Sequence, residues 1–204
     1  IVEGVERQND ASTTWWGGGL KDAGAKPVVF ATSNRVVYSP HEYPASVYGQ
    51  SWFSAPNYPA NLPSVWDANW GYLARTGSAP IFVGEFGTKL ETTSDAQWLR
   101  ALVSYLGTNG LSFGYWSFNP NSGDTGGLVA DDWKTPQTAK LAALAPVLAG
   151  GSATPMPSPT ASATRTPSPT PTPSPTPRTS PTPTSSPTPT PSPTPRTSPT
   201  PTPT

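Results

Sequence analysis

Residues 79–86 read Ala-Pro-Ile-Phe-Val-Gly-Glu-Phe, a short apolar run with a glycine and a glutamate near its end. A run of this length that is rich in branched and aromatic residues indicates a strand buried on both faces. A carboxylate inside such a run is costly unless it is hydrogen-bonded or used. We therefore expect a buried parallel strand that carries Glu85 at its carboxyl end.

Other apolar runs lie on both sides of this one. Residues 1–5, 36–39 and 112–118 are expected to form strands, and residues 28–30 form either a strand or a loop anchor. Near-continuous apolar strands of this kind are typical of parallel sheets whose faces are covered by helices.

Helices are expected between the strands. Ser94 and Gln97 have capping-box spacing, so a helix should open at Ser94 and end at Gly107. Thr135 is expected to cap a second helix that runs towards residue 148, and residues 61–75 form a third. The alternation of strands and helices predicts about four parallel βα units.

Four units are too few for a closed barrel of the common kind. A (β/α)₈ TIM barrel typically needs about 250 residues, and residues 1–151 supply roughly half of that length. The α/β fold is therefore either a small doubly wound sheet or the C-terminal half of a barrel. A chain that opens within a strand favours the half barrel, and hence a piece of a longer protein.

The composition divides the chain near residue 151. Residues 1–151 hold every aromatic residue and a net charge of −3, whereas residues 152–204 are almost entirely Pro, Thr, Ser and Ala with three arginines. A segment with so little to bury is expected to be a disordered, extended linker of the type found in secreted proteins. We therefore expect a partial catalytic domain over 1–151 and a low-complexity linker over 152–204.

Several classes of protein are excluded by composition. The chain has no cysteine, one histidine and a net charge of zero, which argues against a thiolate or multi-histidine metal site and against a nucleic-acid partner. No apolar run approaches the length of a membrane span. We expect no metal, no cofactor, no nucleic acid and no membrane partner.

Polar residues fall at the ends of successive predicted strands. His41 and Tyr43 follow the second strand, Glu85 ends the third, and Trp116 lies near the end of the fourth. Ligands of parallel α/β folds bind at the carboxyl ends of the strands. These residues are therefore expected to share one pocket, although each alone is as readily structural.

The candidate pocket is rich in aromatic residues and poor in cations, which suits a sugar. Indole rings stack on the apolar face of a pyranose, and carboxylate and amide groups bind its hydroxyls. Trp16, Gln50 and Asp124 lie in loops that offer such groups beside aromatic residues. The Gly17–Gly19 run lacks the continuation of a phosphate-binding loop.

Six motifs together resemble glycoside hydrolase family 5. They are Ile-Val-Glu-Gly-Val, Trp-Trp-Gly-Gly, Tyr-Ser-Pro-His-Glu-Tyr, Val-Gly-Glu-Phe-Gly, Tyr-Trp-Ser-Phe-Asn-Pro and Ser-Gly-Asp-Thr-Gly-Gly, and they span about residues 1–149. More narrowly, the chain looks like the secreted actinobacterial endo-β-1,4-glucanases that carry Pro/Ser/Thr linkers. The resemblance implies strands 5–8 of a (β/α)₈ barrel, an extracellular location, and a carbohydrate-binding module beyond the linker.

The resemblance also implies roles for the candidate residues. Glu85 would be the nucleophile of a retaining hydrolysis of β-1,4-glycosidic bonds, and His41 and Tyr43 would orient it. Trp116 would form the sugar platform, while Trp16 and Gln50 match substrate-contact positions. Asp124 lies in a matching loop without an assigned role.

The family's proton donor is not found in this sequence. It is expected in an Asn-Glu-Pro motif, which is absent from the chain, and Glu3 lies in a strand that could approach the site without other support as the acid. A half barrel leaves open sheet edges. The chain alone is therefore expected to be unstable or to associate, and to have little activity.

Two other functions remain open from the sequence. A non-catalytic carbohydrate-binding protein would use the tryptophans for stacking alone, and a cell-surface structural protein would use the linker as a stalk. The choice among cellulose, mixed-linkage glucan, mannan and xyloglucan depends on loops that the motifs do not cover.

Overall fold

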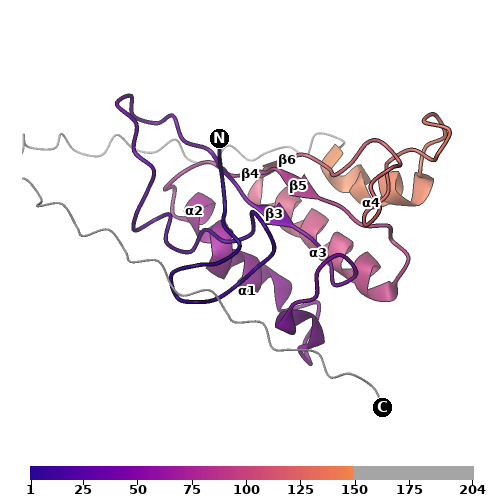
Figure 1. Cartoon of the computed structure of the whole chain (residues 1–204), viewed down its shortest axis with the longest axis horizontal. Helices are drawn as coiled ribbons and strands as arrows, with labels where there is room; N and C mark the ends of the chain where they lie inside the picture. The colour runs from indigo at the N-terminus through magenta and orange to yellow at the C-terminus, as the bar shows by residue number, and fades with distance from the viewer. Residues whose placement is uncertain (149–204) are drawn as a thin grey trace, which may run out of the picture. The chain divides into compact units, whose positions relative to one another are not determined.

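A computed structural model of the chain describes residues 1–148 (Figure 1). The predicted linker at 152–204 and its boundary near residue 151 lie outside the described residues and stay predictions. Within residues 1–148, none of the helices is both long and apolar enough to cross a bilayer.

In the described part of the chain, the strands are short and form three two-stranded parallel sheets. They are β1 (Val2–Glu3), β2 (Tyr38–Ser39), β3 (His41–Glu42), β4 (Phe82–Val83), β5 (Glu85–Phe86) and β6 (Ser112–Phe113). β1 pairs with β2, β3 with β5 and β4 with β6, all in parallel. Only Pro40 separates β2 from β3, and only Gly84 separates β4 from β5. The six strands of residues 1–148 therefore form four extended segments in chain order, which are β1, β2–β3, β4–β5 and β6. The parallel βα arrangement predicted from the apolar runs is confirmed.

The strand predicted at residues 36–39 begins at Tyr38 instead of residue 36, and the extended chain continues beyond Ser39. Residues 38–42 form one tract interrupted at Pro40, whose carbonyl accepts a hydrogen bond from the Gly84 amide. A bridge between Tyr38 and Ile81 joins the same two tracts. His41 therefore lies within a strand, and not just past its end as the sequence suggested.

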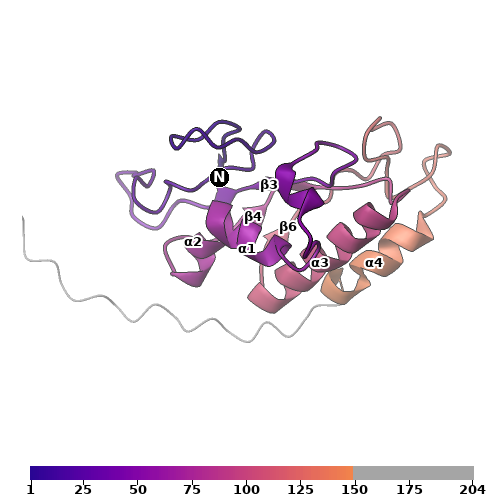
Figure 2. The same cartoon turned by 90° about the horizontal axis from the view of Figure 1, so that it is seen from below.

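The helices lie along one side of the strands. They are α1 (Leu62–Trp66), the π-helical turn η2 (Asp67–Gly71), α2 (Tyr72–Arg75), α3 (Thr93–Asn109) and α4 (Thr138–Leu148), with a 3₁₀ turn η1 at Ser51–Ser54. Figure 2 shows α2, α1, α3 and α4 in a row, with the long loops on the opposite side. The helix predicted at 61–75 is confirmed as one continuous run through α1, η2 and α2.

Three predicted helix ends are wrong. Thr92, and not Ser94, caps α3, because its side chain accepts a hydrogen bond from the Asp95 amide at 3.0 Å. The helix passes through Gly107 and ends before Gly110, whose φ of 60° closes it. α4 begins at Thr138, since the Thr135 hydroxyl bonds Asp132 instead of capping a helix.

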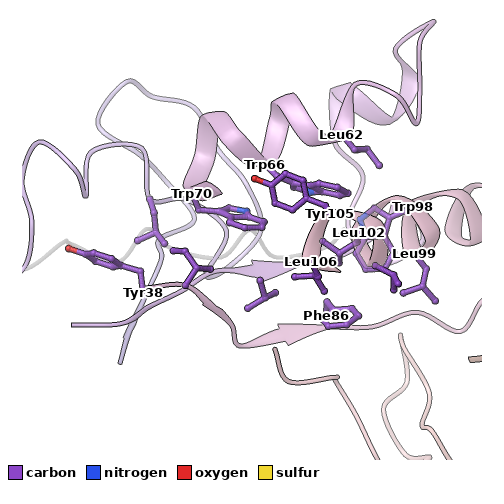
Figure 3. Packing of buried hydrophobic residues seen from close by; sticks show 14 of the residues in the cluster. Tyr38, Leu62, Trp66, Trp70, Phe86, Trp98, Leu99, Leu102, Tyr105 and Leu106 are labelled. Atoms are coloured by element: carbon purple, nitrogen blue, oxygen red, sulfur yellow. The ribbon is translucent and has the colours of Figure 1, made fainter. Parts of the chain in front are cut away.

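The core fills the space between α1, η2, α3 and the strands. Trp98, Leu99, Leu102 and Leu106 of α3 recur at helical spacing and are fully buried, and Figure 3 shows them close to Phe86. The Phe86 ring lies 6.5 Å from that of Trp98. Because Phe86 directly follows Glu85, this packing anchors the strand that carries the candidate carboxylate.

Residues 28–30 do not form a strand. They belong to a long loop after the first strand, and the side chain of Val29 is 81% exposed. The backbone amide of Val28 donates a hydrogen bond to the Tyr38 hydroxyl at 3.0 Å. The alternative of a loop anchor is therefore the one that the structure supports.

Candidate active site

Glu85 and Tyr43 are joined by a short hydrogen bond. The Tyr43 hydroxyl donates to Oε2 of Glu85 at 2.6 Å. Parallel pairing sets this contact, because His41 stands opposite Glu85 in the register of β3 and β5. Burial, and then the hydrogen bond to Glu85 and its charge, raise the pKa of Tyr43 far above its ordinary value. The phenol therefore stays protonated and remains a donor to the carboxylate.

The His41 imidazole lies between two carboxylates. Its Nδ1 atom is 3.3 Å from Oε2 of Glu85 and 3.6 Å from Oε1 of Glu3. Both distances exceed those of an ordinary hydrogen bond, and His41 is only 8% exposed. Since both carboxylates approach the same nitrogen, Glu3 belongs to the site.

The backbone holds the imidazole from the other side. The His41 amide donates to the carbonyl of Gly17 at 3.1 Å, and the His41 carbonyl accepts a hydrogen bond from the indole of Trp15. A Cβ at position 17 would lie 2.7 Å from the imidazole ring, and Gly17 has a φ of 74°. Glycine is therefore required for the loop to pass this close to His41.

Aromatic side chains lie around Tyr43, the hydrogen-bond partner of the carboxylate. Trp16 lies 5.2 Å from Tyr43 and 6.4 Å from Tyr48, measured between ring centroids. Trp16 and Trp116 are 42% and 46% exposed. The Trp116 amide donates to the Phe86 carbonyl at 2.8 Å, which holds the backbone of residue 116 beside the strand of Glu85. Half-exposed indoles next to a carboxylate offer the stacking surfaces that a sugar requires.

The glycine after Phe86 permits this arrangement. A Cβ at Gly87 would overlap the backbone carbonyl oxygen of Trp116. The two segments therefore approach each other more closely than a larger residue would allow.

Asp124 acts electrostatically on a candidate site residue, whereas Gln50 makes no hydrogen bond to one among the described residues. The negative charge of Asp124 lies close enough to Tyr43 to contribute to the raised pKa of its hydroxyl. Gln50 precedes η1, and its side-chain amide nitrogen is buried without a hydrogen-bond partner in the described part of the chain. Among the described residues, no hydrogen bond links Gln50 to Glu85, His41 or Tyr43.

Two further carboxylates were missed or left unassigned by sequence reasoning. Glu3 was visible as an acid in a strand, but its approach to His41 depends on the pairing of β1 with β2. Glu42 lies between the two candidate residues His41 and Tyr43 and is 2% exposed. Within residues 1–148, no group of three histidine or carboxylate side chains is arranged to hold a metal ion.

Comparison with known proteins places this part of the chain in a family. The family model for cellulase (glycosyl hydrolase family 5) matches residues 1–122. An endoglucanase of Paenibacillus polymyxa is 51% identical over 139 residues, which are 66% of this chain and 35% of that protein. The major extracellular endoglucanase of Xanthomonas campestris pv. campestris is 41% identical over 149 residues, which are 70% of this chain and 30% of that protein.

Solved structures match the same part of the chain. The catalytic domain of the Xanthomonas endoglucanase gives a TM-score of 0.66 at 37% identity and covers 72% of this chain and 44% of that one. An endocellulase from Pyrococcus horikoshii, in complex with cellotetraose, gives a TM-score of 0.65 at 35% identity and covers 72% and 42%. The described fold is therefore a partial TIM-barrel-like α/β structure.

The matches also set limits. The chain spans about a third of the length of these curated relatives, and they lend no support to the narrower actinobacterial likeness. The family model nevertheless covers more than half of the 204 residues. On this evidence the chain belongs to the cellulases of glycosyl hydrolase family 5.

Proposed function

We propose that this chain supplies the nucleophile side of a retaining endo-β-1,4-glucanase site that acts on cellulose or a related β-glucan. The observation that carries the proposal is the 2.6 Å hydrogen bond from Tyr43 to Glu85, beside His41. One oxygen of the Glu85 carboxylate is thus bound to the phenol, which holds the carboxylate in place.

Glu85 attacks the anomeric carbon of the bound sugar. One carboxylate oxygen forms a bond to that carbon as the bond to the leaving sugar oxygen breaks, and a second carboxyl protonates that oxygen. Water then hydrolyses the resulting ester. Trp116 and Trp16 support the proposal as half-exposed stacking surfaces on which the sugar rings lie, while Gln50 contributes a loop contact.

The proton donor comes from outside these 204 residues. The family expectation places it in an Asn-Glu-Pro motif, and this sequence has no such tripeptide. Glu3 is 55% exposed, and its carboxylate approaches the His41 imidazole. The chain alone is therefore expected to turn over carboxymethylcellulose slowly, because a leaving sugar must be protonated.

Cellulose and secretion are the substrate and location that the relatives favour. The Pyrococcus endocellulase was crystallised with cellotetraose, and the Xanthomonas relative is named a major extracellular enzyme. We propose the same substrate class and an extracellular location for the protein to which this chain belongs.

An activated sugar tests the role of Glu85 without a proton donor. In a dinitrophenyl 2-fluoro-cellobioside, the leaving group departs as a stable phenolate with its electron pair and needs no proton. The fluorine slows the later hydrolysis, so the glycosyl ester accumulates. Intact-mass and peptide analysis should find one label per chain, on Glu85.

Two variants control this experiment. Glu85→Gln should not be labelled, whereas Glu91→Gln, which changes an exposed acid six residues away, should be labelled as the wild type is. Label on another residue, or none on a folded wild-type chain that binds cellotetraose, would contradict the nucleophile role. Binding without labelling would instead indicate a carbohydrate-binding protein.

A further inference from the structure

Glu42 lies in the same strand as two candidate site residues but faces the opposite way. Successive side chains of a strand alternate between its two faces. His41 and Tyr43 are directed towards Glu85, and Glu42 between them is directed into the core, where it is 2% exposed. No step of the proposed reaction uses this buried carboxyl.

Both oxygens of Glu42 are bound by indoles. Trp66 Nε1 donates to Oε2 at 3.0 Å, and Trp70 Nε1 donates to Oε1 at 2.6 Å. The two tryptophans are four residues apart on the run formed by α1 and η2, so they share one helix face. Figure 3 shows both rings beside Tyr105 in the core. The carboxyl therefore ties β3 to this helix by two directional bonds.

Such a group is costly in a core. An apolar side chain of similar size is often at least as stabilising as a buried charged or polar contact. Burial raises the pKa of Glu42 to about 8, and the two indole bonds only partly oppose this. The benefit to the site is in the position of the strand and not in stability. Directional hydrogen bonds fix a strand along its axis, whereas apolar packing alone does not.

We propose that Glu42 is a positioning residue of this site, which fixes β3 so that His41 and Tyr43 meet Glu85. The inference rests on the proposed function, in which Glu85 is the nucleophile. Glu42 touches no substrate and acts through its two strand neighbours. Its contribution is to keep the hydroxyl of Tyr43 at bonding distance from the carboxylate.

Glu42→Gln and Tyr105→Phe form a matched pair for the test. Glutamine keeps one acceptor oxygen but sets its NH₂ group against an indole N–H, so one of the two bonds is lost. Tyr105→Phe removes a hydroxyl that donates to Asp67 at 2.6 Å in the same aromatic cluster. It leaves both bonds of Glu42 in place. Trp70→Phe removes one indole donor and serves as a second variant if Glu42→Gln fails to fold.

The first readout is the rate of labelling of Glu85 by the dinitrophenyl 2-fluoro-cellobioside. In Glu42→Gln, the maximal rate should fall roughly 10- to 100-fold, as expected for a misplaced reacting group, while the half-saturating concentration changes little. The maximal labelling rate of Tyr105→Phe should stay within about twofold of the wild-type rate. The comparison is made with the melting temperatures of the two variants matched. The proposal would be overturned if the labelling rates of both variants fell in proportion to their melting temperatures. It would also be overturned if Glu42→Gln were labelled at the wild-type rate.

The second readout does not depend on the reaction. His41 is the single histidine of the chain, so the imidazole signals in an NMR spectrum belong to it without ambiguity. They should move in Glu42→Gln and Trp70→Phe and stay unchanged in Tyr105→Phe; unmoved signals in the first two would refute the positioning role. A wild-type chain that is not labelled, together with the expected shifts, would reject Glu85 as nucleophile and leave the role of Glu42 standing.

Discussion

Raising the pH from 5 to 8 should destabilise the wild-type chain and leave Glu42→Gln largely unaffected. Burial raises the pKa of Glu42 from 4.5 to about 8, so the folded state binds more protons than the unfolded state between these values. Stability therefore falls as the pH rises through this window. The contribution of the bound proton is complete below pH 4.5 and is lost once the pH passes about 8.

The magnitude follows from the same two values. One pKa unit corresponds to about 1.4 kcal/mol, so the full rise to about 8 corresponds to about 5 kcal/mol, of which about 4 kcal/mol is lost between pH 5 and pH 8. This is comparable to the whole free energy of unfolding of a small domain, about 5–15 kcal/mol. In urea, with a slope of about 2 kcal/mol per molar, the midpoint should move by roughly 2 M.

Urea unfolding followed by tryptophan fluorescence at pH 5, 6, 7 and 8 measures this effect. The wild-type midpoint should fall steadily, and the midpoint of Glu42→Gln should stay nearly constant. Every other titratable group is shared by the two proteins, so the difference isolates Glu42. The raised pKa of Glu42 would be refuted if the urea midpoints of both proteins changed with pH in the same way, or if the wild-type midpoint rose with pH. Either result would show that the Glu42 carboxyl is charged in the core from pH 5 to pH 8.

Three further substitutions test other contacts. Tyr43→Phe removes the bond to Glu85 and should slow labelling by about 10- to 100-fold, the value of a hydrogen bond to a charged group; an unchanged rate would remove the phenol from the mechanism. Thr92→Ala removes the N-cap of α3 and should cost about 1 kcal/mol in urea unfolding, whereas Ser94→Ala should cost less; the reverse order would contradict the assigned cap. Lys140 donates to the carbonyls of Thr125 and Gly127, so Lys140→Met should cost about 1–3 kcal/mol and increase proteolysis of residues 119–128; equal protection in both proteins would show that the loop is held by other contacts.

The parallel architecture was predictable because it follows from local composition. Short apolar runs separated by amphipathic segments leave few alternatives, and the stripe at Trp98, Leu102 and Tyr105 faces the core as its spacing requires. Helix ends were less predictable. Thr92 and Ser94 are both good caps, and the choice depends on distant partners: Asp95 binds Thr88 and Ser46, and Ser94 binds Tyr58.

The meeting of His41, Tyr43 and Glu85 was expected from strand order, but its detail was not. That His41 stands opposite Glu85 is a matter of register, which the sequence leaves open to a shift of one residue. The surroundings of Glu42 were beyond reach because its partners lie 24 and 28 residues away on a helix. Long-range polar pairs of this kind leave no local pattern.

The two faces of β3 restrict how the length of this segment can change. A deletion or insertion of one residue between Tyr38 and Tyr43 would exchange the faces, sending an imidazole into the tryptophan cluster and a buried acid out beside Glu85. Directly afterwards, at Pro44–Tyr48, the chain forms turns in which backbone amides donate to the Pro44 carbonyl. An extra residue there leaves the strand pairing of β3 unchanged. Libraries that vary loop length around this site should therefore begin after Tyr43.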